Sequence, residues 1–335
     1  MGGQVNEAVT ELYCLAAGYQ ASRVVLAAVE AGAFEALAEA PRTYENLAAR
    51  LGTRPEPTRR LLEALAGLGL LERADGRYAI ARRFADCLTP GRPGYVGDIL
   101  GHHAALWYSW TDLPRVLATG EPVPRDRRSE AIPPERQTRF FIQGMRNLAE
   151  QSLPALLERL DLSPCRSLLD LGGGPATHSI AFCRKYPALR ATVFDLPEAA
   201  VWGRQNVAEA GLADRIAFRE GDFHVDPLGG GYDFIFISSI IHSYTPALNR
   251  ALLERCAAAL APGGVVAVKD FFVAADRSGP VFSLLFGINM LVNTDGGDVF
   301  SQEEVREWLA GAGLEPLPGE IVVDPRASIL LARKP

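Results

Sequence analysis

The sequence predicts an α/β protein in which a doubly wound, mostly parallel sheet follows a largely helical N-terminal part. Residues 1–100 are rich in alanine and leucine at helical spacing. From Arg166 onward, short apolar runs alternate with helical segments, which is the order of a parallel sheet covered by helices. Glycine, aspartate and histidine follow several of these runs, at the strand ends where such sheets bind ligands.

The N-terminal part has the pattern of an all-helical or winged-helix-like domain. Apolar spacing predicts helices over residues 22–38 and 58–70, and Thr43 is placed to cap a helix between them. An Asp-Gly turn at residues 75–76 joins two strand-like segments into a hairpin. We therefore expect residues 1–100 to form one winged-helix-like domain.

The charge of this domain bears on whether it binds DNA. Winged helices that read DNA carry surplus lysine and arginine on the recognition helix and the wing. Residues 1–100 contain no lysine, their acidic and basic residues nearly cancel, and the whole chain has a net charge of −6. The sequence therefore favours a dimerisation domain, and a homodimer, over binding of nucleic acid.

Residues 101–160 are predicted to form a helical connector that contributes to a ligand pocket. Proline, glycine and arginine are frequent up to Pro134, and residues 135–160 have helical periodicity. The domain that follows, residues 161–335, is predicted to be catalytic.

Strands and helices alternate through this last domain. Strands are predicted at 167–171, 190–194, 216–219, 233–238, 265–270, 321–323 and 328–332, and helices at 177–185, 198–210, 248–260 and 303–312. Glycine or proline follows most of the helices and stops them.

Composition argues against several other classes of protein. The five cysteines are scattered without a CxxC pair, and no HxH or HExxH pattern indicates a metal. The N-terminus lacks a basic stretch followed by an apolar run, and the apolar runs are broken short of about 20 residues. We expect a cytoplasmic protein that acts on a small molecule, without a metal and away from membranes.

A glycine-rich turn follows the first predicted strand. Gly172 and Gly174 lie in a DLGGG loop and allow the backbone to approach a ligand closely. Alone, this loop also fits a dinucleotide. However, its spacing is not GxGxxG, and Asp170 suits a ligand with an ammonium group, which S-adenosylmethionine (SAM) carries and NAD lacks at that point.

The next two strands end in further candidate cofactor residues. Asp195 lies about twenty residues beyond the loop, where an acid can accept hydrogen bonds from ribose hydroxyls, although it could also cap a helix. Asp222 and Phe223 can bind an adenine amino group and stack on the base, although a plain β-turn would have the same residues.

The motifs LLDLGGG, VFDLP, GDF, a histidine after the fourth strand and APGG before the fifth occur in this order. Together they resemble SAM-dependent small-molecule O-methyltransferases, a family with plant phenolic and bacterial natural-product enzymes and a winged-helix-like N-terminal domain. The resemblance extends from about Tyr13 to Leu331. It implies a Rossmann-like SAM-binding sheet, SAM as cofactor with S-adenosylhomocysteine as product, and cofactor contacts at Ser238 and Tyr244. Many relatives have lysine at the position of Ser238.

The resemblance also assigns the role of general base to His242. Methyl transfer from a sulfonium is an in-line displacement, and a hydroxyl acceptor must lose its proton to a group such as histidine. Asp270 matches an acid that can orient the imidazole. A second acid of the plant enzymes matches Val299, with Asp298 adjacent, so the chain departs from that pattern.

Aromatic, methionine and asparagine side chains suit a flat aromatic or polyketide-like acceptor. The candidates for the acceptor pocket are Trp107, Phe141, Met145, Asn147, Phe282, Phe286, Asn289 and Met290. Two alternatives stay open: C- or N-methylation on the same scaffold, and a non-methylating relative with hydroxylase, decarboxylase or cyclase-type chemistry.

Overall fold

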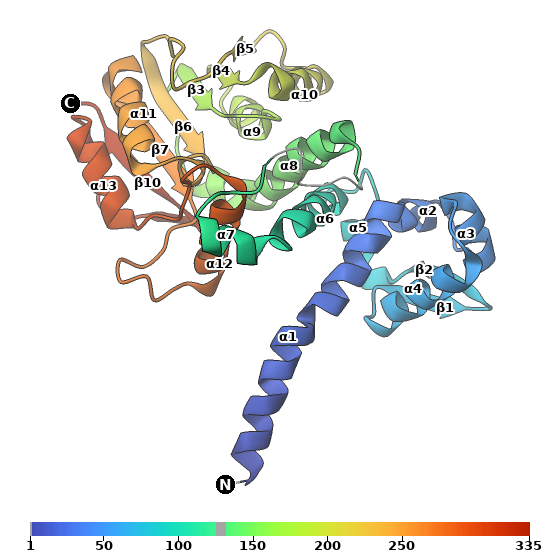
Figure 1. Ribbon diagram of the computed structural model, residues 1–335. Helices are drawn as coiled ribbons and strands as arrows, with labels where there is room; N and C mark the ends of the chain where they lie inside the picture. The colour runs from blue at the N-terminus through green and yellow to red at the C-terminus, as the bar shows by residue number, and fades with distance from the viewer. Residues whose placement is uncertain (1, 125–131) are drawn as a thin grey trace. The chain divides into compact units, whose positions relative to one another are not determined.

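The computed structural model describes residues 2–124 and 132–335, with side chains from residue 6 onward. The chain divides into two compact units (Figure 1). Unit 1 comprises residues 1–107 and 129–147, and unit 2 comprises residues 108–128 and 148–335. Residues of the expected connector are thus shared between the two units, while the three-domain division stays a prediction.

Unit 1 begins with the 30-residue helix α1, which is followed by shorter helices and a hairpin. Its elements are α1 (Gly2–Ala31), α2 (Ala33–Glu39), α3 (Tyr44–Leu51), α4 (Pro55–Gly67), β1 (Leu71–Ala74), β2 (Arg77–Ile80), the 3-10 turn η1 (Arg82–Phe84) and α5 (Ala85–Leu88). The hydroxyl of Thr43 accepts a hydrogen bond from the Asn46 N–H and caps α3, as predicted. Asp75 and Gly76 both have positive φ, as a two-residue hairpin turn requires.

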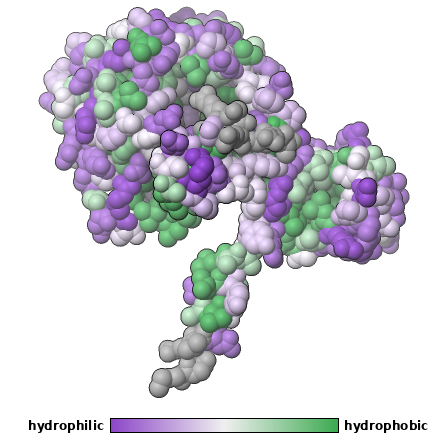
Figure 2. All heavy atoms as spheres, in the orientation of Figure 1, coloured by the Kyte–Doolittle hydropathy of each residue, from purple (hydrophilic) through white to green (hydrophobic). Residues whose placement is uncertain are grey.

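The first helix differs from the prediction over residues 22–38. It begins at Gly2, and Gly32, with φ of 76°, ends it and separates it from α2. Large apolar side chains of α1 are exposed by 45–75%, and they form hydrophobic patches along this helix (Figure 2). They are Val9, Leu12, Tyr13, Leu15 and Tyr19. Periodicity did not reveal this part of the helix because its apolar residues do not line a core within the chain.

One helix bears on the expectation that every apolar run is too short to span a membrane. By length and composition alone, residues 6–31 of α1 would suffice for a membrane-crossing helix, with 17% of the relevant window buried. A helix whose apolar residues pack on another protein subunit has the same composition, so this feature alone does not establish a membrane segment.

Three helices occupy the expected connector and its surroundings. They are α6 (Gly97–Trp110), α7 (Leu113–Thr119) and α8 (Pro134–Arg159), which confirms the predicted helical character of this region. Residues 125–131, part of the same prediction, lie outside the described residues.

Unit 2 contains an eight-stranded sheet with order β5-β4-β3-β6-β7-β10-β8 and β9 paired to β10. Its elements are β3 (Ser167–Leu171), α9 (Thr177–Lys185), β4 (Arg190–Asp195), α10 (Pro197–Glu209), β5 (Ile216–Glu220), β6 (Tyr232–Ser238), η3 (Ile241–Ser243), α11 (Pro246–Ala259), β7 (Leu260–Asp270), α12 (Val281–Asn293), α13 (Gln302–Gly311), β8 (Glu315–Pro316), β9 (Ile321–Asp324) and β10 (Ala327–Arg333). Strands β3 to β7 pair in parallel and β10 runs antiparallel, which confirms the doubly wound, mostly parallel prediction.

One strand begins earlier than predicted. Strand β7 starts at Leu260, within the segment expected to end helix α11 and turn. The backbones of Gly263 and Gly264 exchange hydrogen bonds with Lys334 near the end of the chain. This partner is about seventy residues away in the sequence, so local turn signals could not show the pairing.

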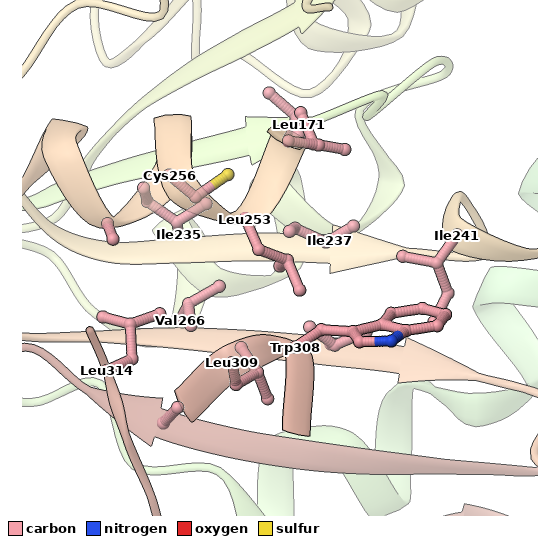
Figure 3. Close-up of a cluster of buried hydrophobic side chains, with 14 of the residues drawn as sticks. Leu171, Ile235, Ile237, Ile241, Leu253, Cys256, Val266, Trp308, Leu309 and Leu314 are labelled. Carbon is pink, nitrogen blue, oxygen red and sulfur yellow. The ribbon is translucent and has the colours of Figure 1, made fainter. Parts of the chain in front are cut away.

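Helices cover both faces of the sheet, and each face has its own core. Strand residues such as Ile235 and Val266 pack with Leu253 of α11 and Trp308 of α13 (Figure 3). We call this side the α11 face. On the other side, the α9 face, strand residues pack with side chains of α8, α9 and α10, including Phe182.

Alternation along β7 decides the direction of the ionisable side chains at its end. Val266 and Val268 belong to the core of the α11 face, and Ala267 belongs to the core of the α9 face. Because successive strand residues point to opposite faces, Asp270 continues the α11 row and Lys269 continues the α9 row.

Candidate cofactor and catalytic site

The glycine loop after β3 is tightly packed. Gly172 and Gly174 have φ of 66° and 44°, a region that favours glycine. A Cβ atom at Gly172 would lie 2.3 Å from Cδ1 of Ile240, and one at Gly173 would lie 2.7 Å from the carboxyl carbon of Asp170. The loop therefore needs its glycines both for its conformation and for close packing.

Asp195 binds this loop directly. Its Oδ2 accepts a hydrogen bond of 2.7 Å from the Gly174 N–H, and its Oδ1 accepts one of 2.7 Å from the Leu196 N–H. Leu196 is the N-cap residue of α10, so Asp195 is not a cap of that helix. Burial raises the pKa of Asp195. Each carboxylate oxygen keeps a second lone pair, which fits the predicted role of binding ribose hydroxyls.

Asp170 lies beneath the loop on the α9 face and is almost fully buried. The Ser179 hydroxyl donates a hydrogen bond of 2.6 Å to its Oδ2. Burial raises the pKa of Asp170 to about 6, although the bond from Ser179 opposes this effect. Asp170 thus supports the loop, and its contact with an ammonium group stays a prediction.

Two residues of α10 support the loop and were missed by sequence reasoning. Gly203 lets the helix approach closely, because a Cβ atom there would lie 2.6 Å from the Gly174 carbonyl oxygen. The Asn206 side chain donates a hydrogen bond of 2.9 Å to the Pro175 carbonyl oxygen. Nothing local in the sequence separates these residues from other helix positions.

Aromatic rings gather after β5. Phe223 is buried, and the ring of Tyr244 from the segment after η3 lies 5.9 Å from it in an edge-on arrangement. His224 contacts both rings, and its buried Nε2 has no partner among the described residues. Asp222 accepts a hydrogen bond from the His224 N–H, so the β-turn interpretation describes part of its role. The structure brings together the predicted Phe223 and Tyr244.

His242 and Asp270 form a buried pair on the α11 face. The Nδ1 of His242 lies 2.7 Å from Oδ1 of Asp270, which also accepts a hydrogen bond from the Phe271 N–H. The His242 Nε2 makes no hydrogen bond with a described residue. With the Nδ1 proton donated to the carboxylate, Nε2 presents a lone pair.

The turn that carries His242 is held by a residue that the sequence did not reveal. The side chain of buried Asn249 donates hydrogen bonds to the carbonyl oxygens of Ile241 and Tyr244, on either side of His242. Gly297 packs against the same turn, because a Cβ atom there would lie 2.4 Å from the His242 carbonyl oxygen.

The second acid of the plant pattern has no counterpart here. Val299 is buried, and both carboxylate oxygens of Asp298 bind the Arg277 guanidinium at 2.8 and 2.9 Å. Asp298 is therefore part of a half-exposed ion pair.

Three phenylalanine rings form a cluster, and two of them adjoin His242. Phe271 stacks on its imidazole at 5.9 Å, and Phe286 meets it edge-on at 4.8 Å. Phe282 contacts both of these rings. Phe282 and Phe286 were predicted, whereas Phe271, directly after a strand, gave no signal of its own.

The other candidates for the acceptor pocket differ in their hydrogen bonds and in the unit to which they belong. Asn289 accepts hydrogen bonds from Trp110 and Asn293, and Met290 is buried. Asn147 accepts a hydrogen bond from the Ile99 N–H in the first turn of α6, which gives it a structural role. Trp107, Phe141 and Met145 belong with Asn147 to unit 1, so their contribution to a pocket stays a prediction.

Ser238 ends β6 and is in register with Lys269 of β7. No group of three histidine, cysteine or acidic side chains suited to a metal occurs among residues 2–124 and 132–335.

Comparison with known proteins relates most of the chain to one family. Residues 129–315 match the O-methyltransferase domain, and residues 13–88 match the O-methyltransferase dimerisation domain. The chain is 36% identical to the 3-hydroxy-5-methyl-1-naphthoate 3-O-methyltransferase of Streptomyces sahachiroi, over 91% of this chain and 89% of that one. It is 32% identical to the tetracenomycin polyketide synthesis 8-O-methyl transferase of Streptomyces glaucescens, over 96% and 95%.

A solved structure is similar over the same extent. The human N-acetylserotonin methyltransferase in complex with SAM superposes with a TM-score of 0.86 and 28% identity, covering 100% of this chain and 99% of that one. The glycine loop, the Asp195 carboxylate and the aromatic cluster fit the same cofactor. The chain therefore belongs to the SAM-dependent O-methyltransferase family, as a methyltransferase of small metabolites with an N-terminal dimerisation domain.

Proposed function

We propose that this enzyme methylates a hydroxyl group on a flat aromatic or polyketide-like metabolite, with His242 as general base. The observation that carries the proposal is the buried hydrogen bond of 2.7 Å between His242 and Asp270. It fixes the imidazole tautomer and leaves Nε2 to accept a proton.

Asp270 is a positioning residue in this mechanism. Its carboxylate orients the imidazole before the reaction and stabilises the imidazolium after Nε2 takes the acceptor proton. Since Asp270 is 2% exposed, water does not compete for this bond. The deprotonated oxygen is then the nucleophile.

Asp195, the glycine loop and the cluster of Phe223 and Tyr244 are proposed to hold SAM. Asp195 binds the ribose, the two rings contact the adenine, and Gly172 allows close approach of the backbone. Bound SAM supplies the electrophilic methyl group. Ser238 and Asp222 are further proposed contacts.

The acceptor class follows from the rings beside His242 and from the relatives. Phe271, Phe282 and Phe286 offer flat apolar surfaces, on which a fused aromatic ring can stack. The bacterial relatives named above act on a naphthoate and on a tetracenomycin polyketide. Both observations support an aromatic hydroxyl as the acceptor group.

A substitution of His242 tests this function. His242→Gln is expected to lower the rate of methyl transfer from labelled SAM to phenolic acceptors by about 10²–10⁴-fold, because the proton then lacks its acceptor. Calorimetry with S-adenosylhomocysteine is expected to give an unchanged affinity. Retained turnover in the variant would show that His242 is not the base, and NMR of the product distinguishes O- from C-methylation.

We further propose that the enzyme is a homodimer that forms through unit 1. The dimerisation domain includes the exposed apolar residues Tyr13, Leu15 and Tyr19 of α1, and a second copy would bury them. The five free cysteines support a reducing, cytoplasmic location.

A double substitution in α1 tests the dimer. Leu12→Glu with Leu15→Glu is expected to give the mass of a monomer in light scattering, because charges would then be buried at the interface. Leu117→Glu, at an equally exposed site on α7, is the control and should leave the dimer intact. A monomeric wild type, or a dimeric double variant, contradicts the proposal.

A further inference from the structure

Lys269 has a buried amine that the proposed mechanism does not use. It is one of only three lysines in the chain, it is 6% exposed, and it points to the α9 face. Throughout residues 2–124 and 132–335, no side chain or carbonyl forms a hydrogen bond or ion pair with its amine. Burial lowers the pKa of Lys269, and the negative charges of Asp324 and Asp270 oppose this effect. Neither carboxylate forms an ion pair with the amine.

Those two carboxylates bind other groups. Oδ1 of Asp270 accepts hydrogen bonds from His242 and from the Phe271 N–H. Oδ1 of Asp324 accepts hydrogen bonds from the backbone N–H groups of Arg326 and Ala327. A buried ammonium without a counter-charge costs free energy, and proteins rarely keep one without a use.

A second unpartnered group lies close to this amine. His178, the second residue of α9, is 8% exposed, and its Nε2 has no hydrogen-bond partner in the described chain. Its ring meets Phe236 of β6 edge-on at 4.9 Å. Phe236 is in register with Ala267 of β7, two residues before Lys269 on the same face, so the imidazole and the amine lie along one edge of the sheet. Burial, together with the charge of Lys269, lowers the pKa of His178 to about 3. A neutral imidazole can donate from Nε2.

The surroundings favour an anion. The N-cap of α9 is Ala176 in a left-handed conformation, which offers no capping side chain. In the first turn the Ser179 N–H binds Asp170, which leaves the N–H groups of Thr177 and His178. Thr177, at the start of the helix, has a buried hydroxyl that also lacks a described partner. Amine, imidazole and helix N-terminus all favour negative charge.

This group of polar atoms adjoins both halves of the proposed reaction site. Ser238, beside the expected cofactor, is in register with Lys269. Phe271, two residues further on, lies on the same side as Lys269 and contacts His242 and Phe286. A ligand held near His242 can therefore extend toward the amine.

We propose that Lys269 and His178 form a carboxylate-binding subsite of this methyltransferase. The inference rests on the proposed function, because the ligand is bound beside His242. The carboxylate belongs either to the methionyl part of the cofactor or to an aromatic acceptor. A carboxylate supplies the negative charge that the amine lacks and accepts from the imidazole N–H.

Calorimetry with matched probes distinguishes the two sources. S-adenosylhomocysteine is compared with 5′-methylthioadenosine, which lacks the amino-carboxylate. 1-Naphthoate is compared with 1-naphthalenemethanol on enzyme saturated with S-adenosylhomocysteine. None of these probes is turned over, so the result is independent of whether His242 is the base.

Lys269→Met removes the charge and keeps the length of the side chain. The substitution is expected to weaken binding of one carboxylated probe by about tenfold or more, because a charge-assisted hydrogen bond is lost. The affinity for the neutral counterpart of that probe should not change. A loss confined to S-adenosylhomocysteine assigns the subsite to the cofactor, and a loss confined to naphthoate assigns it to the acceptor.

Lys185→Met is the matched control, since Lys185 ends the same helix and donates to the Leu157 carbonyl. Thermal unfolding establishes that each variant is folded. His178→Phe keeps the ring contact with Phe236 and should weaken the same probe as Lys269→Met. If Lys269→Met leaves the affinities of both carboxylated probes unchanged, the subsite does not exist.

Discussion

Asp270 and Lys269 are neighbours on one strand, yet their surroundings differ. Asp270 faces the α11 side, where His242 and the Phe271 N–H bind it. Lys269 faces the α9 side, where no described group pairs with its amine. A buried charge that is paired within the protein keeps a side chain oriented, whereas an unpaired one remains available to a ligand. At the end of β7, one face thus suits orientation of the catalytic histidine and the opposite face suits binding of a ligand.

The largest effect is expected from breaking the hydrogen-bonded pair of His242 and Asp270. Asp270→Asn should lower the turnover number by about 10²–10³-fold, because the amide does not stabilise the imidazolium and permits the wrong tautomer. Single-turnover methyl transfer measures this loss of rate. Calorimetry checks that the variant still binds S-adenosylhomocysteine.

Asp298→Asn is the control for this substitution. Asp298 binds the half-exposed Arg277 and has no described contact with His242, so its loss should change turnover little. If Asp270→Asn turns over no more slowly than Asp298→Asn, Asp270 does not position His242.

The second prediction concerns stability on the unsatisfied side. In the absence of ligand at pH 7, Lys269→Met is expected to raise the free energy of unfolding by about 1–4 kcal/mol, because an unpaired buried amine is replaced by an apolar chain of similar volume. Chemical denaturation followed by circular dichroism measures the change.

The pH dependence of this effect has a definite sign. The folded-state pKa of Lys269 is lowered from 10.5, so the unfolded chain binds the proton more tightly. Stability of the wild type therefore rises with pH between the lowered pKa and 10.5, and the advantage of Lys269→Met should shrink over that window. An advantage that grows with pH would contradict the assignment.

The smallest effect is expected at Asp170, a buried carboxyl group on the α9 face that accepts hydrogen bonds from Ser179. Its pKa of about 6 lies above the ordinary 3.8, so the folded state binds the proton more tightly. The cost of its buried charge is absent below pH 3.8 and complete above about pH 6.

Asp170→Asn should therefore stabilise the protein by about 1–2 kcal/mol at pH 7, less than the full linkage value because the amide must also be desolvated. Unfolding curves at pH 4 and pH 7 measure this, and the gain should vanish at the lower pH. An equal gain at both pH values would mean that the charge of Asp170 is not its cause.

Several parts of the fold followed from the sequence alone. Strand β3 and helix α9 have the predicted limits, because an apolar run and a glycine-proline turn mark them locally. The start of β7 was missed, since it pairs with residues near the chain's end. The extent of α1 was missed because its apolar side chains have no core to face within the chain.

In the candidate site, too, some residues are marked by local sequence and others depend on distant contacts. Gly172, Asp195 and His242 lie in motifs of local spacing, so the sequence pointed to them. Asn249 and Gly203 gave no signal, because their hydrogen bond and close contact join segments that are distant in sequence. Their importance depends on what packs against them.

The sequence by itself determined the order of strands and helices, the glycine loop, the cofactor class and the candidate base. These depend on backbone conformation and on residue spacing, which are local properties. Only the tertiary structure decided which of the charged groups at the end of β7 has a side-chain partner. Alternation places Lys269 and Asp270 on opposite faces, but the side-chain partner of Asp270, His242, comes from the separate turn η3. One charge thereby acquired a partner within the fold, while the other acquired none.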